Sequence, residues 1–245
     1  MERNAAACAM DWSIELEKGL RSKKPGQVFE AISQIGRRLE QWSREPEPTM
    51  PVYSMFNLFP GEDRLFANTI LLRLADSFVK GDKHVRLAVV KIFLSEWRHR
   101  NKKMWQHGIL TKNRVNNHLE LLHRVKLVYS SADVESRALS LILLGCWAHF
   151  SKDSAEIRYM ILSTLVSSDV LEVKASLFAA GCLCELCTDF ANVVLEMLVN
   201  MFTSSETPVV VKLAGAKAFG KMGSSSLLAN KAYRVVYLLS LPTFI

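Results

Sequence analysis

The sequence predicts an all-α fold made of repeated helical hairpins. Apolar residues recur at steps of three and four along most of the chain, which is the spacing of one helix face. No long alternation of apolar and polar residues suggests strands, and 11 glycines and 7 prolines in 245 residues are few for a strand-and-turn protein. With 49% hydrophobic residues, the chain can bury a sizeable core.

The hairpin pattern is clearest in residues 167–201. Buried positions are expected at Val173, Leu177, Ala180, Cys184 and Cys187 of a first helix, and at Phe190, Val194, Met197 and Met201 of a second. Asp169 and Asp189 each precede one helix, where a carboxylate can accept hydrogen bonds from free backbone N–H groups. Small residues would allow two helix backbones to approach closely: Ala175, Ala179, Ala180 and Gly181.

A similar helix start occurs four times along the chain. Aligning Val85, Ser136, Val173 and Val211 gives spacings of 51, 37 and 38 residues. Each start is preceded by an acidic residue (Asp82, Asp133, Asp169 or Glu206) and followed by a basic one (Arg86, Arg137, Lys174 or Lys212), so that the acid can cap its own helix and the base can pair with a neighbouring repeat. Two periods just under 40 residues predict a HEAT- or armadillo-like solenoid, with hairpins stacked in a right-handed superhelix. Chance recurrence in a helical protein is the alternative.

Two hairpins are expected before residue 97. The first joins helices over residues 12–20 and 28–42, with Pro25-Gly26 opening the second helix. Residues 45–51 contain three prolines and are expected not to be helical, so residues 45–61 are interpreted as a proline-rich loop. The next hairpin joins helices over residues 66–78 and 85–92 through a turn at Gly81.

Residues 97–114 form a basic insertion. Between residues 96 and 126 there are eight basic residues against two acidic ones, which accounts for most of the net charge of +7. Arg98, Arg100, Lys102 and Lys103 lie between Trp97 and Trp105. Three interpretations remain open: a solvated loop anchored by the tryptophans, a nuclear import signal, or a contact with nucleic acid or an acidic protein surface.

No metal site is expected. The histidines at positions 99, 107, 118 and 123 are 8, 11 and 5 residues apart, and none of these spacings puts two ligands on one helix face. Cys184 and Cys187 would share a face, but Cys182 would point roughly the opposite way and no second cysteine pair exists. Buried cysteines acting as small apolar side chains are therefore favoured over a zinc site.

The sequence has no pattern that indicates an enzyme. It lacks a glycine-rich phosphate loop, a nucleophile elbow and a conspicuous carboxylate pair, and we expect no cofactor and no small-molecule ligand. The alanine-rich start is too short for a signal peptide core, and no apolar run reaches the roughly 18 residues of a membrane helix. Five cysteines without a framework spacing favour reduced thiols in the cytosol or nucleus.

Several segments together resemble the Integrator complex subunit 7 family. They lie between residues 16 and 222 and are densest at 17–22, 66–78, 137–145 and 172–180. Each segment alone is a weak signal because it is a repeat helix, but their order and spacing make the set fairly specific. The proline-rich and basic insertions depart from the animal pattern, and the amino-acid sequence of the segments is similar to that of a plant member.

The resemblance implies a non-catalytic α-solenoid scaffold in the nucleus. Integrator associates with RNA polymerase II, cleaves the 3′ ends of small nuclear RNA precursors and attenuates transcription, with its endonuclease and phosphatase in other subunits. The implied partners are other Integrator subunits and, through the complex, the polymerase. The runner-up interpretation is a transport or adaptor solenoid that binds protein cargo.

Residues 1–222 are expected to form the solenoid and residues 223–245 a divergent apolar tail. Family members are much longer than 245 residues, so the resemblance implies an N-terminal portion or a truncated form. The tail does not resemble the polar cap that ends a solenoid. We therefore expect exposed apolar surface over residues 209–245, and a chain that aggregates or depends on a partner.

Overall fold

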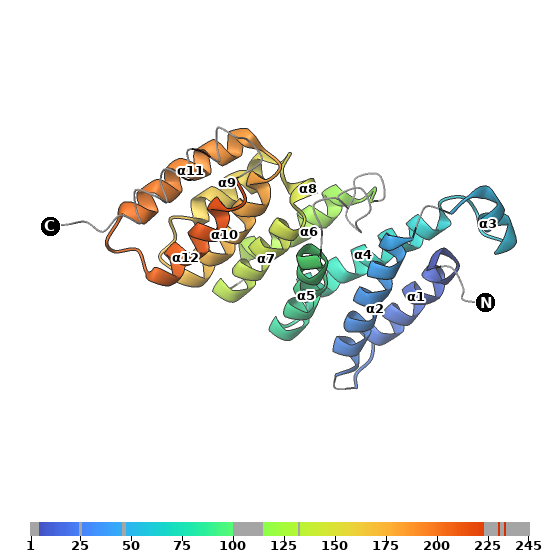
Figure 1. Ribbon diagram of the computed structural model, residues 1–245. Helices are drawn as coiled ribbons and strands as arrows, with labels where there is room; N and C mark the ends of the chain where they lie inside the picture. The colour runs from blue at the N-terminus through green and yellow to red at the C-terminus, as the bar shows by residue number, and fades with distance from the viewer. Residues whose placement is uncertain are drawn as a thin grey trace. The chain divides into compact units, whose positions relative to one another are not determined.

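The computed structural model describes residues 5–24, 26–45, 48–99, 115–131 and 133–222, together with Asn230 and Tyr233. Within these ranges every regular element is a helix and there is no strand, which confirms the all-α prediction (Figure 1). No helix in this part of the chain has both the length and the apolar character needed to cross a membrane. The chain divides into two compact units, residues 1–128 and 129–245.

Two stacked hairpins make up the first unit. Its helices are α1 (Ala5–Leu20), α2 (Gln27–Arg44), α3 (Met50–Met55), α4 (Glu62–Lys80), α5 (Lys83–His99) and most of α6 (His118–Ser131). α1 packs against α2 and α4, α2 packs against α5, and α4 contacts α5. Each helix of the first hairpin thus packs on its counterpart in the second, which gives two helical layers.

Glycines with positive φ shape the starts of α2 and α4. Gly26 has φ of 80° and Gly61 has φ of 84°, a region that residues with a side chain rarely adopt. Each glycine directly precedes its helix. The sequence prediction that a turn at Gly26 opens the second helix is therefore confirmed.

The proline-rich segment is not a loop throughout, and the prediction was wrong for part of it. α3 begins at Met50, within the residues that the prolines were expected to keep non-helical. Pro51 lies in the first turn of α3, where its missing N–H removes no helical hydrogen bond. Pro46 and Glu47 lie outside the described residues.

A buried carboxylate ties α3 to α2 and α4. Asp63, in the first turn of α4, is only 3% exposed and accepts hydrogen bonds from Trp42 Nε1 and Tyr53 Oη, each at 3.1 Å. These donors and the positive end of the helix dipole compensate the carboxylate for its lost water. Burial raises the pKa of Tyr53, so its hydroxyl remains protonated and available as a donor.

The second unit is organised around α10. Its helices are α7 (Val134–Cys146), α8 (Ala148–Ser151), α9 (Ala155–Thr164), α10 (Val170–Cys184), α11 (Thr188–Thr203) and α12 (Val209–Phe219). α10 contacts each of the other five and lies between α7 and α12 (Figure 1). A helix in this position is apolar on all sides rather than along one stripe.

The buried face that the sequence predicts for α10 is confirmed, but it is incomplete. Val173, Leu177, Ala180 and Cys184 are buried, and Cys187, beyond the helix end, is half-buried. The other sides of α10 are buried too, at Ala175, Ala179 and Cys182. The helix therefore has no solvent-facing stripe over most of its length.

Small residues set the spacing between α10 and its neighbours. A Cβ added to Gly145 of α7 would lie 2.8 Å from the Cα of Ala179. One added to Gly181 would lie 3.3 Å from the Cα of Ala218 in α12. The small residues that the sequence analysis singled out thus allow α10 to approach the helices on its two sides, which come from other hairpins.

All four aligned repeat starts fall in the first turn or so of a helix. Val85, Ser136, Val173 and Val211 lie in α5, α7, α10 and α12, respectively. Within the second unit the last three of these helices are adjacent, because α10 packs against both α7 and α12. The near-equal spacing in the sequence therefore corresponds to one layer of neighbouring helices.

Three of the predicted acidic caps are confirmed. Asp82, Asp133 and Asp169 accept hydrogen bonds from the backbone N–H groups of Val85 (2.9 Å), Ser136 (2.9 Å) and Leu171 (2.8 Å). The bonds from the backbone and hydroxyl of Ser136 hold the pKa of Asp133 below its usual value. These carboxylates satisfy N–H groups that have no partner within the helix.

Two other predicted caps were wrong. Asp189 lies inside the first turn of α11, and Cys187 occupies the position before the helix without a side-chain hydrogen bond. Pro208, rather than Glu206, directly precedes α12. Asp189 still favours the helix, because a negative charge in the first turn interacts well with the helix dipole.

Three of the basic residues that follow the repeat starts have roles of two kinds. Arg137 forms the expected ion pair with the next repeat, at Glu172 of α10. Arg86 donates to the carbonyl oxygens of Phe78 and Val79, and Lys212 donates to that of Phe202. Since carbonyl groups at a helix end have no helical partner, these two cations stabilise the end of the preceding helix.

Candidate interaction surfaces

The structure describes only one of the four basic residues predicted as an import signal or nucleic-acid patch. Arg98 lies near the end of α5 and is exposed. Arg100, Lys102 and Lys103 lie outside the described residues, as does most of the basic insertion at 97–114. The three interpretations of this insertion therefore stay predictions.

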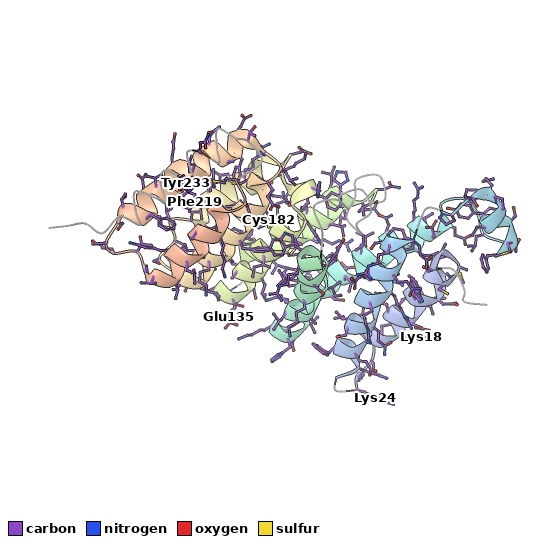
Figure 2. The ribbon with its side chains drawn as sticks, viewed as in Figure 1. Lys18, Lys24, Glu135, Cys182, Phe219 and Tyr233 are labelled. Atoms are coloured by element: carbon purple, nitrogen blue, oxygen red, sulfur yellow. The ribbon has the colours of Figure 1, made fainter. Side chains whose placement is uncertain are left out.

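In the described part of the chain the cysteines are thiols and not disulfides. Cys146, Cys182 and Cys184 are buried, and Cys182 lies within the second unit (Figure 2). Burial raises the pKa of the Cys184 thiol, which disfavours the thiolate that reacts or binds metal. In the described ranges no group of three or more His, Cys, Asp or Glu side chains is placed to hold a metal ion.

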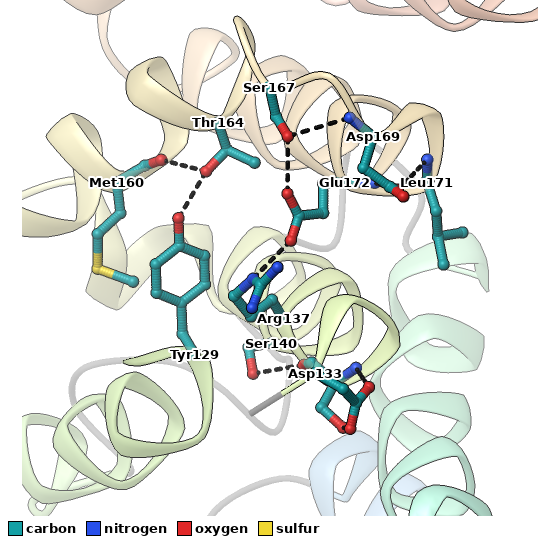
Figure 3. A network of polar contacts seen from close by, with 11 residues as sticks. Tyr129, Asp133, Arg137, Ser140, Met160, Thr164, Ser167, Asp169, Leu171 and Glu172 are labelled. Atoms are coloured by element: carbon teal, nitrogen blue, oxygen red, sulfur yellow. Dashed lines mark hydrogen bonds and ion pairs between the residues drawn. The ribbon is translucent and has the colours of Figure 1, made fainter. Parts of the chain in front are cut away.

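A polar network joins the first turns of α7 and α10 (Figure 3). Arg137 Nε donates to Glu172 Oε1 at 2.5 Å, and Ser167 Oγ donates to Glu172 Oε2 at 2.8 Å. The Glu172 side chain is 8% exposed, so this ion pair is largely shielded from water. Nearby, the hydroxyls of Tyr129 and Thr164 share a hydrogen bond of 2.7 Å. Each of these side chains has a protein partner, which is typical of a structural network.

A groove lies between α2 and α5 in the first unit. It has a volume of about 200 Å³ and is lined by Phe29, Ser33, Gly36, Arg37 and Glu40 of α2, and by Ala88, Lys91, Ile92, Ser95 and Glu96 of α5. Small-molecule sites usually have about 300–1,000 Å³. This groove is smaller, and its size suits one or two amino-acid side chains of a partner.

The sequence analysis did not find this groove. The available signal was a set of small residues at helical spacing on two helices: Ser33 and Gly36, then Ala88 and Ser95. Residues three, four or seven apart share one helix face, so small side chains at such positions can leave space where two helix faces meet. Nothing in the sequence, however, showed that α2 packs against α5.

Exposed apolar side chains elsewhere include those on α12 and around α3. On α12, Val209 is 81% exposed and Leu213 is 59% exposed, so part of the apolar surface expected over residues 209–245 is present. Around α3, Met50, Met55 and Phe59 are exposed as well. Exposed apolar clusters are common where proteins bind one another. Apart from Asn230 and Tyr233, residues 223–245 lie outside the described ranges.

A family model described as Integrator complex subunit 7, N-terminal, matches residues 14–241. The chain belongs to the Integrator complex subunit 7 family. This match confirms the resemblance found in the sequence and includes residues 223–241, most of the 223–245 tail that we expected to diverge from the family.

Curated relatives support the same assignment. The chain is 29% identical over 223 residues to Integrator complex subunit 7 of Mus musculus, covering 91% of the chain. It is 28% identical over 223 residues to the Homo sapiens protein, and 26% identical over 219 residues to the Dictyostelium discoideum homologue. The chain spans about a fifth of the length of these relatives, 20% of the mouse and human proteins and 18% of the Dictyostelium protein.

Proposed function

We propose that this chain is a non-catalytic scaffold of the nuclear Integrator complex. In this role it supports 3′-end processing of small nuclear RNAs and regulation of transcription by RNA polymerase II through protein–protein contacts. The observation that carries the proposal is the family match over residues 14–241. Its partners are other Integrator subunits and, through the complex, the polymerase.

The helical packing within each unit supports a scaffold role. Hairpins stack on one another in the first unit, and α7, α10 and α12 form a layer of neighbouring helices in the second. Such packing presents long helical surfaces to partners, as repeat proteins do. The proposal includes a continuous α-solenoid with a right-handed superhelix. The buried polar groups around Glu172 join helices to one another, in keeping with a structural role.

Affinity capture tests this proposal directly. The tagged 245-residue chain should recover other Integrator subunits and RNA polymerase II from a nuclear extract of the cells that make it. An unfolded variant, such as the Leu177→Asp chain considered below, should recover neither. If import cargo or coat proteins are recovered in place of Integrator subunits, the scaffold proposal fails and the transport or adaptor interpretation replaces it.

Alanine replacement of Arg98, Arg100, Lys102 and Lys103 separates the interpretations of the basic insertion. An import signal predicts that the tagged variant moves toward the cytoplasm. A nucleic-acid contact predicts weaker RNA binding and a flatter salt dependence, by about one unit of slope for each lost phosphate contact. A solvated loop predicts no change in either assay. Alanine at Lys23 and Lys24, both exposed, is the control for general loss of charge.

A further inference from the structure

The groove between α2 and α5 has an apolar floor. Ala88 is buried, and Gly36 and Ile92 are half-buried. A methyl group at position 36 would lie 2.9 Å from Ile92, so glycine here allows α2 to pack closely against Ile92 of α5. Phe29 lines the groove and is 49% exposed. An apolar side chain of a partner placed here would remove apolar surface from water on both molecules.

Two cations flank this floor. Arg37 of α2 and Lys91 of α5 are exposed, and neither side chain forms an ion pair or hydrogen bond with another described residue. The lining also has two carboxylates: Glu40 pairs with Arg44 at 2.5 Å, and half-buried Glu96 has a partner, although its Oε2 is buried without a hydrogen bond. The groove therefore offers a partner two positive charges beside an apolar hollow.

We propose that this groove binds an acidic peptide segment of a partner protein, with one apolar side chain seated between α2 and α5. Carboxylates on either side of that anchor would pair with Arg37 and Lys91. Complementary charge fixes the register and selects the partner, while the buried anchor adds affinity. This inference rests on the proposed scaffold function, because it assigns a surface and a ligand chemistry to that role.

A peptide fits these residues better than a nucleic acid does. Binding to a phosphate backbone depends on many Lys and Arg contacts along a continuous track. Among the described lining residues there are only two cations, too few for such a track. Among the lining residues that the structure describes, Phe29 is the single aromatic residue on which a base could stack.

The test uses two synthetic fluorescent peptides and the complete 245-residue chain. One peptide carries a single leucine flanked by aspartates, and the other has lysine in place of each aspartate. Fluorescence anisotropy should show binding of the acidic peptide, weakening as salt increases, and little binding of the lysine peptide. The Arg37→Glu, Lys91→Glu double variant should bind the acidic peptide at least about tenfold more weakly and should gain binding of the lysine peptide.

Two control variants make this result specific. Lys23→Glu with Lys24→Glu changes the net charge by the same amount in the turn between α1 and α2, where Figure 2 labels Lys24, and should leave acidic-peptide binding within about twofold. Ser33→Trp should fill the groove from an exposed position on α2 and block binding without lowering the melting temperature.

Several outcomes would overturn the assignment. The groove is not the site if the Arg37→Glu, Lys91→Glu variant and the Ser33→Trp variant both bind the acidic peptide as the unaltered chain does. The same conclusion follows if the Lys23→Glu, Lys24→Glu control weakens binding equally. A single-stranded RNA that binds tightly and is lost in the same variants would show a phosphate contact instead. If Integrator subunits are captured while the groove variants have no effect on peptide binding, only the groove assignment fails. If the peptide binds as expected while capture recovers no Integrator subunit, only the scaffold proposal fails.

Discussion

Replacing Leu177 by aspartate should unfold the second unit of the chain. Leu177 lies in the middle of α10 with none of its surface exposed, and α10 contacts every other helix from α7 to α12. A carboxylate there would be buried without a partner while the leucine side chain is lost. Together these effects should cost more than about 4 kcal/mol, a large share of the roughly 5–15 kcal/mol that stabilises a domain. Thermal unfolding followed by circular dichroism would measure it.

A control in the same helix separates the effect of burying a charge from the effect of introducing an aspartate into α10. Leu171, in the first turn of α10, is 44% exposed, and aspartate there should change the free energy of unfolding by less than about 1 kcal/mol. Leu177→Ala should remain folded and lose about 2–5 kcal/mol. Equal melting temperatures for Leu177→Asp and Leu171→Asp would show that α10 is not buried as described.

The sequence predicted the helices well because their signals are local. The apolar spacing located α10, and the carboxylates of Asp82, Asp133 and Asp169 marked three helix starts that the structure confirms. These features depend on residues a few positions apart, so one stretch of sequence contains the whole signal. The same reasoning failed at Asp189, since α11 begins at Thr188, two residues earlier than a cap at Asp189 would place it.

Helix partners were harder to predict from the sequence. α10 is apolar on all sides, so its periodicity cannot show which face meets which neighbour. The contacts of Gly145 with Ala179 and of Gly181 with Ala218 join residues more than 30 positions apart. Proline content was also misleading at Pro51, because the first turn of a helix tolerates a residue without an N–H group.

The candidate interaction surface was the least predictable feature for the same reason. Arg37 and Lys91 lie far apart in the sequence, and each alone resembles an ordinary exposed basic residue on a helix. Only the packing of α2 against α5 brings them to one groove. By contrast, the densest basic cluster in the sequence attracted a functional interpretation because its residues lie close together between positions 98 and 103.

Breaking the ion pair between Arg137 and Glu172 should destabilise the second unit by about 2–3 kcal/mol. Removing one member of a buried pair typically costs about 3–5 kcal/mol, and the partial exposure of Arg137, 34% of its side chain, reduces this value. In Arg137→Met, Glu172 would remain 8% exposed with Ser167 Oγ as its other donor. Urea denaturation at neutral pH would measure the loss.

A second substitution distinguishes the ion pair from the packing of the arginine stem. Adding Glu172→Leu to Arg137→Met should restore most of the lost stability, because no buried charge is then left without its partner.

Arg44→Met, which breaks the more exposed pair with Glu40, should cost less than about 1 kcal/mol. If Arg137→Met costs no more than Arg44→Met, or if the double variant is less stable than Arg137→Met, the contact does not hold α7 and α10 together. The stability of that layer would then come from the close packing at Gly145 and Ala179 alone.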